Sequence, residues 1–240
     1  MGRFFLHGQK GDMGAAYNTG GRLGLASKIK RLLEETEMKY GFMAMAMPIV
    51  LDKTVYSFLQ NYGIEVTSLL KKNIRKEYWG IVKRTPALDK GNSLTSTLYI
   101  GCYLVAFHKA APDIIDEKCF EGLIRCLCDE MMRREKENDS AFSEKNIKSR
   151  EEAAKRSQTS VCEMDWKSTF RRIDKDNYEF TYSKCGLCEL GKREGCFNLI
   201  KYLCMTDYIS FDKGGAKLIR NHTLANGDEY CDFHVSRKEK

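Results

Sequence analysis

Residues that could carry out chemistry are concentrated in the last quarter of the chain, where residues 178–235 contain five of the ten cysteines. Cys204 and Asp207 are three residues apart in a stretch with helical periodicity, so we expect their side chains on one helix face. A carboxylate beside a thiol can accept its proton or orient a water molecule, but it disfavours the thiolate. A nearby cation is therefore needed, and Arg220 or His222 on a following predicted strand could supply it. The alternative is a buried Cys204 that only fills space and an Asp207 that pairs locally.

Two further cysteines, Cys185 and Cys188, lie where a predicted strand ends, a position typical of zinc knuckles. Cys204 and Cys231 could complete four thiolate ligands. A structural zinc site usually has a second close pair, and the interval from Cys204 to Cys231 is too long for one. We therefore expect no cofactor, with zinc as the alternative. A redox pair is a further alternative, although no βαβ pattern surrounds the cysteines.

The C-terminal part is predicted to contain both strands and a helix, and these elements must position the candidate site residues. Residues 162–173 and 178–183 have the two-residue period of strands, and residues 196–207 have the period of a helix. Residues 217–224 and 230–235 are predicted as a hairpin around Asn226-Gly227, with a register that the sequence leaves open. The order strand, strand, helix, strand, strand predicts an antiparallel sheet with helices packed on one side. The fold class is therefore α+β.

The N-terminal part is predicted to be helical. We expect a flexible glycine-rich leader over 1–27, a helical part over 28–135 with an interruption at Pro48, a charged linker over 136–160 and the α+β part over 161–240, with 28–240 forming one domain. Residues 94–110 are apolar enough for a buried helix, with a strand as the alternative. Cys119, Cys126 and Cys128 are predicted to fill space in the core.

Composition excludes several classes of protein. The 40 Lys and Arg exceed the 33 Asp and Glu by 7, without a clustered basic stripe, so we expect no nucleic-acid partner. Neither a signal peptide nor an apolar run of about 20 residues is visible, so we expect a cytoplasmic protein with reduced thiols and no membrane partner. The expected partner is a small-molecule substrate, and a homo-oligomer is an option.

A family resemblance is carried by Tyr178 to Cys185, by Cys204-Met205-Thr206-Asp207, by Arg220-Asn221-His222-Thr223-Leu224-Ala225-Asn226-Gly227 and by Cys231-Asp232-Phe233. In these stretches the chain resembles the bacterial family named L-2-amino-thiazoline-4-carboxylic acid hydrolase. Gly186 follows Cys185, where such proteins commonly have proline. The resemblance implies hydrolysis of a thiazoline ring to a carbamoyl-cysteine, by cleavage of either its C–N or its C–S bond.

Such a reaction needs an attacking group, a proton donor and a cation for the carboxylate of the substrate. We therefore interpret Cys204 as the nucleophile and Asp207 as the general base or water-positioning residue. Cys185 or Cys231 would be a second thiol lining the pocket. Arg220 would hold the carboxylate, His222 would donate the proton, and Thr223 is a further candidate for substrate binding. The alternatives are a non-catalytic module that senses a metal or small molecule through its cysteines, and an inactive partner subunit.

Overall fold

The computed structural model describes the backbone of residues 20–89 and 92–239, and the side chains from residue 41 onward within those ranges. Its helices are α1 (Gly20–Asn61), α2 (Ser68–Arg84), α3 (Thr95–Lys109), α4 (Glu117–Arg134), α5 (Glu144–Ser157), α6 (Gly186–Glu194), α7 (Phe197–Leu203) and α8 (Met205–Lys213), with single 3-10 turns at Ser140–Phe142 and Leu224–Asn226. Residues Tyr40–Lys240 form one compact unit, and the first part of α1 belongs to a separate unit. The site described below lies entirely within Tyr40–Lys240.

The C-terminal part contains a four-stranded antiparallel sheet, which confirms the α+β fold class. Its strands are β1 (Lys167–Arg172), β2 (Asn177–Lys184), β3 (Ala216–Ile219) and β4 (Cys231–Arg237), in the spatial order β1-β2-β4-β3. The register places Tyr182 opposite Cys231 and Phe180 opposite Phe233. Because side chains alternate between faces, these four side chains share the inner face of the sheet. Asp232 and His234 point to the other face.

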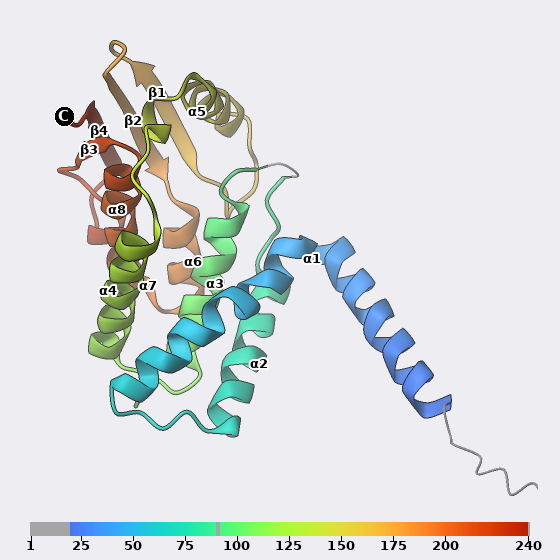
Figure 1. Ribbon diagram of the computed structural model, residues 1–240. Helices are drawn as coiled ribbons and strands as arrows, with labels where there is room; N and C mark the ends of the chain where they lie inside the picture. The colour runs from blue at the N-terminus through green and yellow to red at the C-terminus, as the bar shows by residue number, and fades with distance from the viewer. Residues whose placement is uncertain (1–19, 90–91, 240) are drawn as a thin grey trace, which may run out of the picture. The chain divides into compact units, whose positions relative to one another are not determined.

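Figure 1 shows the arrangement of these helices and strands. Two hydrophobic clusters hold the elements of the Tyr40–Lys240 unit together. One cluster joins the N-terminal helices to α6 and α7, with α3 packed on α6 and α4 packed on α7 and α8. The other cluster lies on the inner face of the sheet, where α5 packs on β1 and α8 on β3. Tyr182 and Leu224 pack against both clusters. The N-terminal helices thus reach the sheet largely through the helices that follow β2.

Helix α1 continues through Pro48, so the predicted interruption at that residue is wrong. The helical path breaks instead at Gly41, where φ is 76° and favours glycine. Proline has no backbone N–H, so the carbonyl of Ala44, four residues earlier, lacks its usual helical donor. The Tyr78 hydroxyl of α2 donates to this fully buried carbonyl. A side chain from another helix therefore compensates for the missing donor.

Replacing Tyr78 by phenylalanine should lower the free energy of unfolding by about 1–3 kcal/mol, because the Ala44 carbonyl would be buried without a donor. Chemical denaturation of both proteins measures this loss. The matched control is the same replacement in a Pro48→Ala background, where the restored N–H donates to Ala44 and the loss should be smaller. Equal losses in the two backgrounds would contradict this explanation.

Three predicted segments differ from the structure. Residues 1–19 of the predicted leader lie outside the described residues, and residues 20–27 are helical. The charged stretch 136–160, predicted as a linker, contains the 14-residue helix α5. This helix forms because Ile147, Ala154 and Ser157 give it one face that is buried against the sheet cluster. Strand β3 ends at Ile219, so residues 220–224 form a loop and not the predicted strand.

Residues 94–110 form the buried helix α3 that we predicted, and Cys119 and Cys128 lie in the core as expected, whereas Cys126 is only partly buried. Residues Gly41–Asn61 are long and apolar enough to cross a membrane by length and composition alone, although the sequence suggested no such segment. In the structure Val55 and Leu59 of this segment are fully buried within the helical cluster. Its Asp52 accepts hydrogen bonds from Tyr103 of α3 and from Arg75 of α2.

Candidate functional site

The two hydrophobic clusters meet at three cysteines. Cys185 and Cys204 pack against the helical cluster, and Cys231 belongs to the sheet cluster. Cys185 follows β2 as the residue before α6, Cys204 joins α7 to α8, and Cys231 begins β4. All three thiols are free. The structure therefore brings together the three cysteines that the sequence analysis assigned to the site.

Close packing at Gly186 holds the turn from Cys185 into α6. A side chain at this position would begin 2.1 Å from the Met164 carbonyl oxygen and 2.8 Å from the Trp166 ring. Neither neighbour is the end of a flexible chain, so only glycine fits without a backbone shift. Met164 and Trp166, which precede β1, thus pack directly against the first turn of α6 and help to position Cys185.

Cys204 and Asp207 lie at the break between two short helices, not on one continuous helix. Cys204 is the last residue before α8, and Asp207 lies in the first turn of α8. The Asp207 carboxylate accepts a hydrogen bond of 2.7 Å from Nη1 of Arg220. Its side chain is 39% exposed, whereas that of Arg220 is 4% exposed. Asp207 is therefore accessible from solvent, while its partner is enclosed.

Both Nη atoms of Arg220 are engaged within the protein. Besides its ion pair with Asp207, its Nη2 donates to the Cys204 carbonyl oxygen at 3.0 Å. The guanidinium lies over the Tyr208 ring at 5.1 Å and the Phe233 ring at 4.9 Å. Both Nη atoms are used, and Nε is buried without a partner among the described residues, so Arg220 presents no exposed edge to a substrate carboxylate, which differs from our expectation. It fixes Asp207 beside Cys204 instead.

The thiols are held in their neutral form. Burial, together with the nearby Asp207, Cys185 and Cys231, raises the pKa of Cys204 to about 12, although the charge of Arg220 opposes this shift. Burial likewise raises the pKa of Cys231 to about 11, against a hydrogen bond from the Leu224 amide to its sulfur at 3.2 Å. A hydrogen bond with the Cys188 thiol, together with burial, raises the pKa of Cys185 well above its usual value. Any thiolate chemistry therefore needs an additional positive charge.

Although the Asp207 side chain is partly exposed, the protein packed around it desolvates the carboxyl and raises its pKa above the ordinary value, while the charge of Arg220 and the hydrogen bond from it oppose the shift. A carboxylate with a raised pKa is a stronger base than an ordinary one. Its negative charge raises the pKa of Cys204 and of Cys231, so the carboxylate lies near these two thiols. Asp207 is thus suited to accept a proton.

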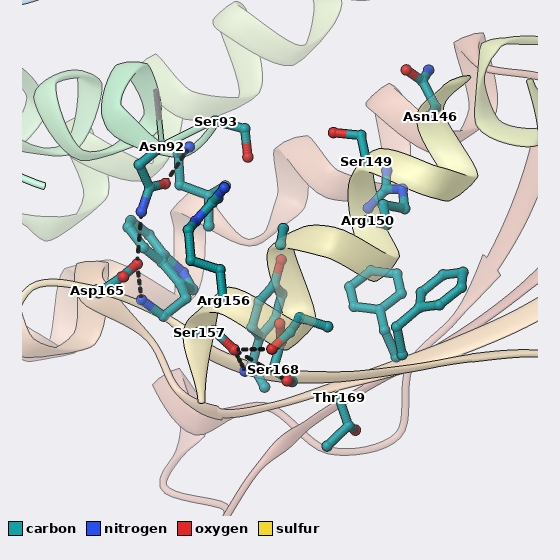
Figure 2. Close-up of a pocket in the computed structure, with 17 residues that line it drawn as sticks. Asn92, Ser93, Asn146, Ser149, Arg150, Arg156, Ser157, Asp165, Ser168 and Thr169 are labelled. Carbon is teal, nitrogen blue, oxygen red and sulfur yellow. Dashed lines mark hydrogen bonds between the residues drawn. The ribbon is translucent and has the colours of Figure 1, made fainter. Parts of the chain in front are cut away.

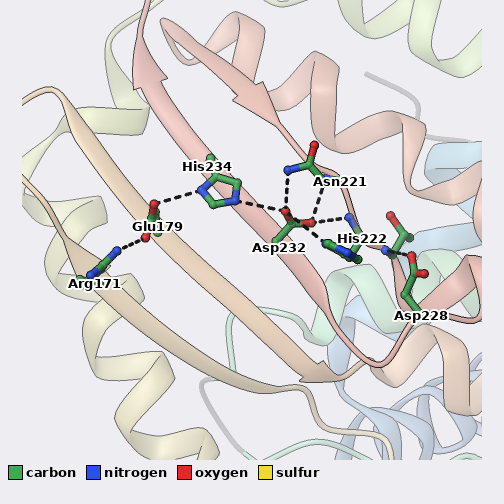
Figure 3. A network of polar contacts seen from close by, with 8 residues as sticks. Arg171, Glu179, Asn221, His222, Asp228, Asp232 and His234 are labelled. Carbon is green, nitrogen blue, oxygen red and sulfur yellow. Dashed lines mark hydrogen bonds and ion pairs between the residues drawn. The ribbon is translucent and has the colours of Figure 1, made fainter.

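The loop that carries Arg220 is held by a carboxylate on the outer face of the sheet (Figure 3). Asp232 accepts hydrogen bonds from the backbone amides of Asn221 at 2.9 Å and His222 at 2.5 Å. These bonds lower the pKa of Asp232 although its burial raises it. His234 then links Asp232 to Glu179 on β2. This outer network fixes the loop and, through it, the position of Arg220.

Two predicted site residues do not join the thiols. The His222 ring packs against Tyr230 at 4.8 Å and lies beside Asp232 on the outer face. Thr223 is buried, and its backbone amide donates to Asp228. Among the described residues, neither contacts a thiol of the cluster in any recorded interaction. The structure therefore gives both residues roles in the loop and does not place His222 as a proton donor.

A pocket of about 300 Å³ opens beside the cluster, between α5 and the inner face of β1 and β2 (Figure 2). It is lined by hydroxyl and amide groups, by aromatic rings and by two arginines, Arg150 and Arg156. Tyr182 lines this pocket and also lies near the thiol cluster. Burial raises the pKa of its hydroxyl, and the charges of Asp207, Cys185 and Cys231 add to this shift. Tyr182 thus connects the pocket with the thiol cluster, although the three cysteines and Asp207 do not themselves line the pocket.

Sequence analysis missed Arg150, because it lies in the stretch predicted as a charged linker. A signal was present, since Ile147, Arg150, Ala154 and Ser157 recur at spacings of three and four and so share one helix face. Three of these four residues are buried, and Arg150 is partly buried among them. Tyr182 was recognised as an inward residue of a strand but not as a site residue.

The zinc alternative required Cys185, Cys188, Cys204 and Cys231 to converge. Within residues 41–89 and 92–239, no group of three or more His, Cys, Asp or Glu side chains is arranged to hold a metal ion.

Comparison with known families identifies a match over most of the described chain. The family model described as L-2-amino-thiazoline-4-carboxylic acid hydrolase matches residues 92–235, which begin just before α3 and end in β4. No curated protein and no solved structure matches the chain. The matched residues include the three cysteines, Asp207, Arg220 and the pocket.

Proposed function

Because the chain belongs to the L-2-amino-thiazoline-4-carboxylic acid hydrolase family, we propose that it hydrolyses the ring of L-2-amino-thiazoline-4-carboxylate at Cys204 and Asp207. The observation that carries this proposal is the convergence of a nucleophilic thiol and a base of raised pKa beside a pocket. Cys204 and Asp207 are adjacent, Asp207 is accessible, and Arg220 holds the carboxylate in place.

The proposed chemistry uses the substrate itself as the missing cation. The carbon between the ring sulfur and ring nitrogen belongs to an amidine, which carries a positive charge when protonated. Bound beside Cys204 and Asp207, this charge favours the thiolate over the thiol. Asp207 accepts the thiol proton, and the sulfur of Cys204 forms a bond to the amidine carbon. The neutral thiol of the free protein is then activated only when substrate is present.

Ring opening and release follow from the same residues. One ring heteroatom leaves the amidine carbon and takes the proton that Asp207 accepted. A water molecule next adds to that carbon, giving up a proton to Asp207. The bond to Cys204 breaks, and the thiol recovers its proton from Asp207. The hydroxyl on the same carbon loses its proton to the product or to solvent as the carbonyl of the carbamoyl group forms, which removes the proton that the amidine brought. The net change is addition of one water to the substrate, with Cys204 and Asp207 restored. Cleavage of the C–N bond yields S-carbamoyl-cysteine, and cleavage of the C–S bond yields N-carbamoyl-cysteine.

The direct test is to incubate purified, reduced protein with L-2-amino-thiazoline-4-carboxylate and to follow the ring-opened product by mass spectrometry. A thiol-specific reagent distinguishes the two products, since only N-carbamoyl-cysteine has a free thiol. Product formation over many turnovers is the expected result. Absence of product with folded protein would overturn the proposed function.

A further inference from the structure

Arg150 is a cation without a polar partner in the part of the chain that the structure describes. It extends from α5 and lines the pocket, and no hydrogen bond or ion pair with a described residue engages it. Its guanidinium lies over the rings of Phe180 at 5.2 Å and Phe211 at 5.1 Å. The rings support the flat face of the guanidinium and leave its N–H edge free for hydrogen bonds.

Arg150 and Arg220 lie near the same stack of aromatic rings but have different surroundings. Phe180 and Phe233 stack at 4.2 Å, with Arg150 over Phe180 and Arg220 over Phe233. Arg220 is neutralised by Asp207, whereas Arg150 meets no carboxylate. The charge of Arg150 nevertheless reaches the reacting groups, since it lowers the pKa of both Asp207 and Tyr182. Arg150 and the Arg220–Asp207 pair thus flank the same aromatic stack.

The remaining lining of the pocket suits a polar anion. Ser149 and Ser168 present hydroxyl groups, and Asn146 presents an amide. The one carboxylate of the lining, Asp165, already accepts hydrogen bonds from the Asn92 side chain at 3.0 Å and the Trp166 amide at 2.8 Å. Figure 2 shows Asp165 at the opposite end of the pocket from Asn146, Ser149 and Arg150. Negative charge is thus absent from the Arg150 end.

Resting on the proposed function, we propose that Arg150 binds the carboxylate of the substrate and makes the enzyme specific for carboxylate-bearing thiazolines. A guanidinium can hold a carboxylate through two parallel hydrogen bonds, which also orients the ring. The carboxylate lies on the ring carbon next to the ring nitrogen, so anchoring it at Arg150 turns the amidine carbon towards Tyr182 and the thiol cluster. Arg150 is thereby a binding residue, and Cys204 and Asp207 do the chemistry.

The test compares two substrates in four proteins. The substrates are L-2-amino-thiazoline-4-carboxylate and 2-amino-thiazoline, which lacks the carboxylate. The proteins are wild type, Arg150→Gln, Arg150→Lys and Arg156→Gln, the last as a matched control from the same helix and pocket. Thermal denaturation establishes that each is folded. Binding of both compounds is measured by calorimetry alongside kcat/KM.

For Arg150→Gln we expect kcat/KM on the carboxylate substrate to fall about 100-fold, with little change on 2-amino-thiazoline. The decrease in kcat/KM should be smaller for Arg150→Lys, because lysine keeps the positive charge but cannot form two parallel hydrogen bonds with a carboxylate. Arg156→Gln should retain the preference for the carboxylate. Equal losses on both substrates in Arg150→Gln, or loss of the preference in Arg156→Gln alone, would overturn the proposal.

Failure of the proposed function gives a different pattern. In that case wild type turns over neither compound, and calorimetry alone decides the role of Arg150. Binding of the carboxylate compound that is tighter than that of 2-amino-thiazoline, and is lost in Arg150→Gln, would support the assignment. Failure of wild type to bind the carboxylate compound, or equal binding by wild type and Arg150→Gln, would overturn it.

Discussion

Cys204→Ala is expected to reduce turnover of L-2-amino-thiazoline-4-carboxylate by at least about 1,000-fold, because the proposed covalent step loses its nucleophile. The replacement removes one sulfur atom from a partly buried position, so the protein should remain folded. Steady-state kinetics measures the loss. Cys126→Ala is the matched control, since Cys126 is a partly buried thiol of α4 whose charged neighbours, Asp129, Glu130 and Arg133, lie on the same helix.

A second variant separates two mechanisms at the same site. Asp207→Asn removes the base and should reduce turnover by about 100- to 10,000-fold. If Cys204→Ala retained full activity while Asp207→Asn lost it, Asp207 would direct water at the substrate and the nucleophile assignment would be wrong. Because Asp207→Asn also takes a partner from the enclosed Arg220, its thermal stability must be compared with that of wild type.

The pH dependence of this reaction follows from the same carboxylate. Asp207 must be ionised to accept a proton, and burial holds its pKa above the ordinary 3.8 despite Arg220. Activity should therefore be present above this raised pKa and be lost as pH falls through it. A kcat/KM profile from neutral to acidic pH measures the transition. A profile that stays flat through the acidic range would contradict the role of Asp207 as base.

Glu194→Ala is expected to lower the free energy of unfolding by about 2–4 kcal/mol. The Glu194 side chain is 1% exposed and accepts hydrogen bonds from Arg84 at 2.6 Å and Lys109 at 2.8 Å. It ties the ends of α2 and α3 to the end of α6. Without it, two cations are left without their partner, although their side chains are 45% and 29% exposed and water screens part of the loss.

The matched control for Glu194 is Glu163→Ala. Glu163 is 74% exposed and meets Arg193 only at 3.8 Å, so its replacement should change stability by less than about 1 kcal/mol. Chemical denaturation of the two variants and wild type gives the comparison. Similar small losses in both variants would show that the buried ion pairs do not stabilise the fold.

The contribution of the Glu194 ion pairs to protein stability should decrease as pH falls. Burial raises the pKa of Glu194, but the hydrogen bonds from Arg84 and Lys109 outweigh it and bring the pKa below its ordinary 4.5. A carboxyl with a lowered pKa in the folded protein contributes stability above its unfolded pKa and loses it as pH falls through the folded one. Glu194→Gln should therefore lose less stability between neutral and acidic pH than wild type.

Local sequence patterns were sufficient to predict secondary structure where one face of a helix or strand is buried. The alternation of Tyr178, Phe180 and Tyr182 predicted β2, and the apolar run of residues 94–110 predicted α3, because burial imposes these periods on the sequence. The α+β class follows from such elements taken in order. Local patterns gave a wrong prediction at Pro48, where we expected the helix to be interrupted. The carbonyl left without a helical donor accepts a hydrogen bond from Tyr78 on another helix instead.

For the site, the sequence by itself determined the types of chemical group, and the tertiary structure decided their partners. Cys185, Cys204, Cys231 and Asp207 were identified from residue type and family resemblance, and they do meet. The sequence could not show that Arg220 pairs with Asp207 inside the protein while Arg150 lacks a polar partner in the part of the chain that the structure describes, because the fold determines both. Arg220 is occupied because the loop after β3 carries it onto Asp207, and Arg150 is free because α5 packs over the sheet cluster. Both facts rest on contacts between residues far apart in the chain, which no local period encodes.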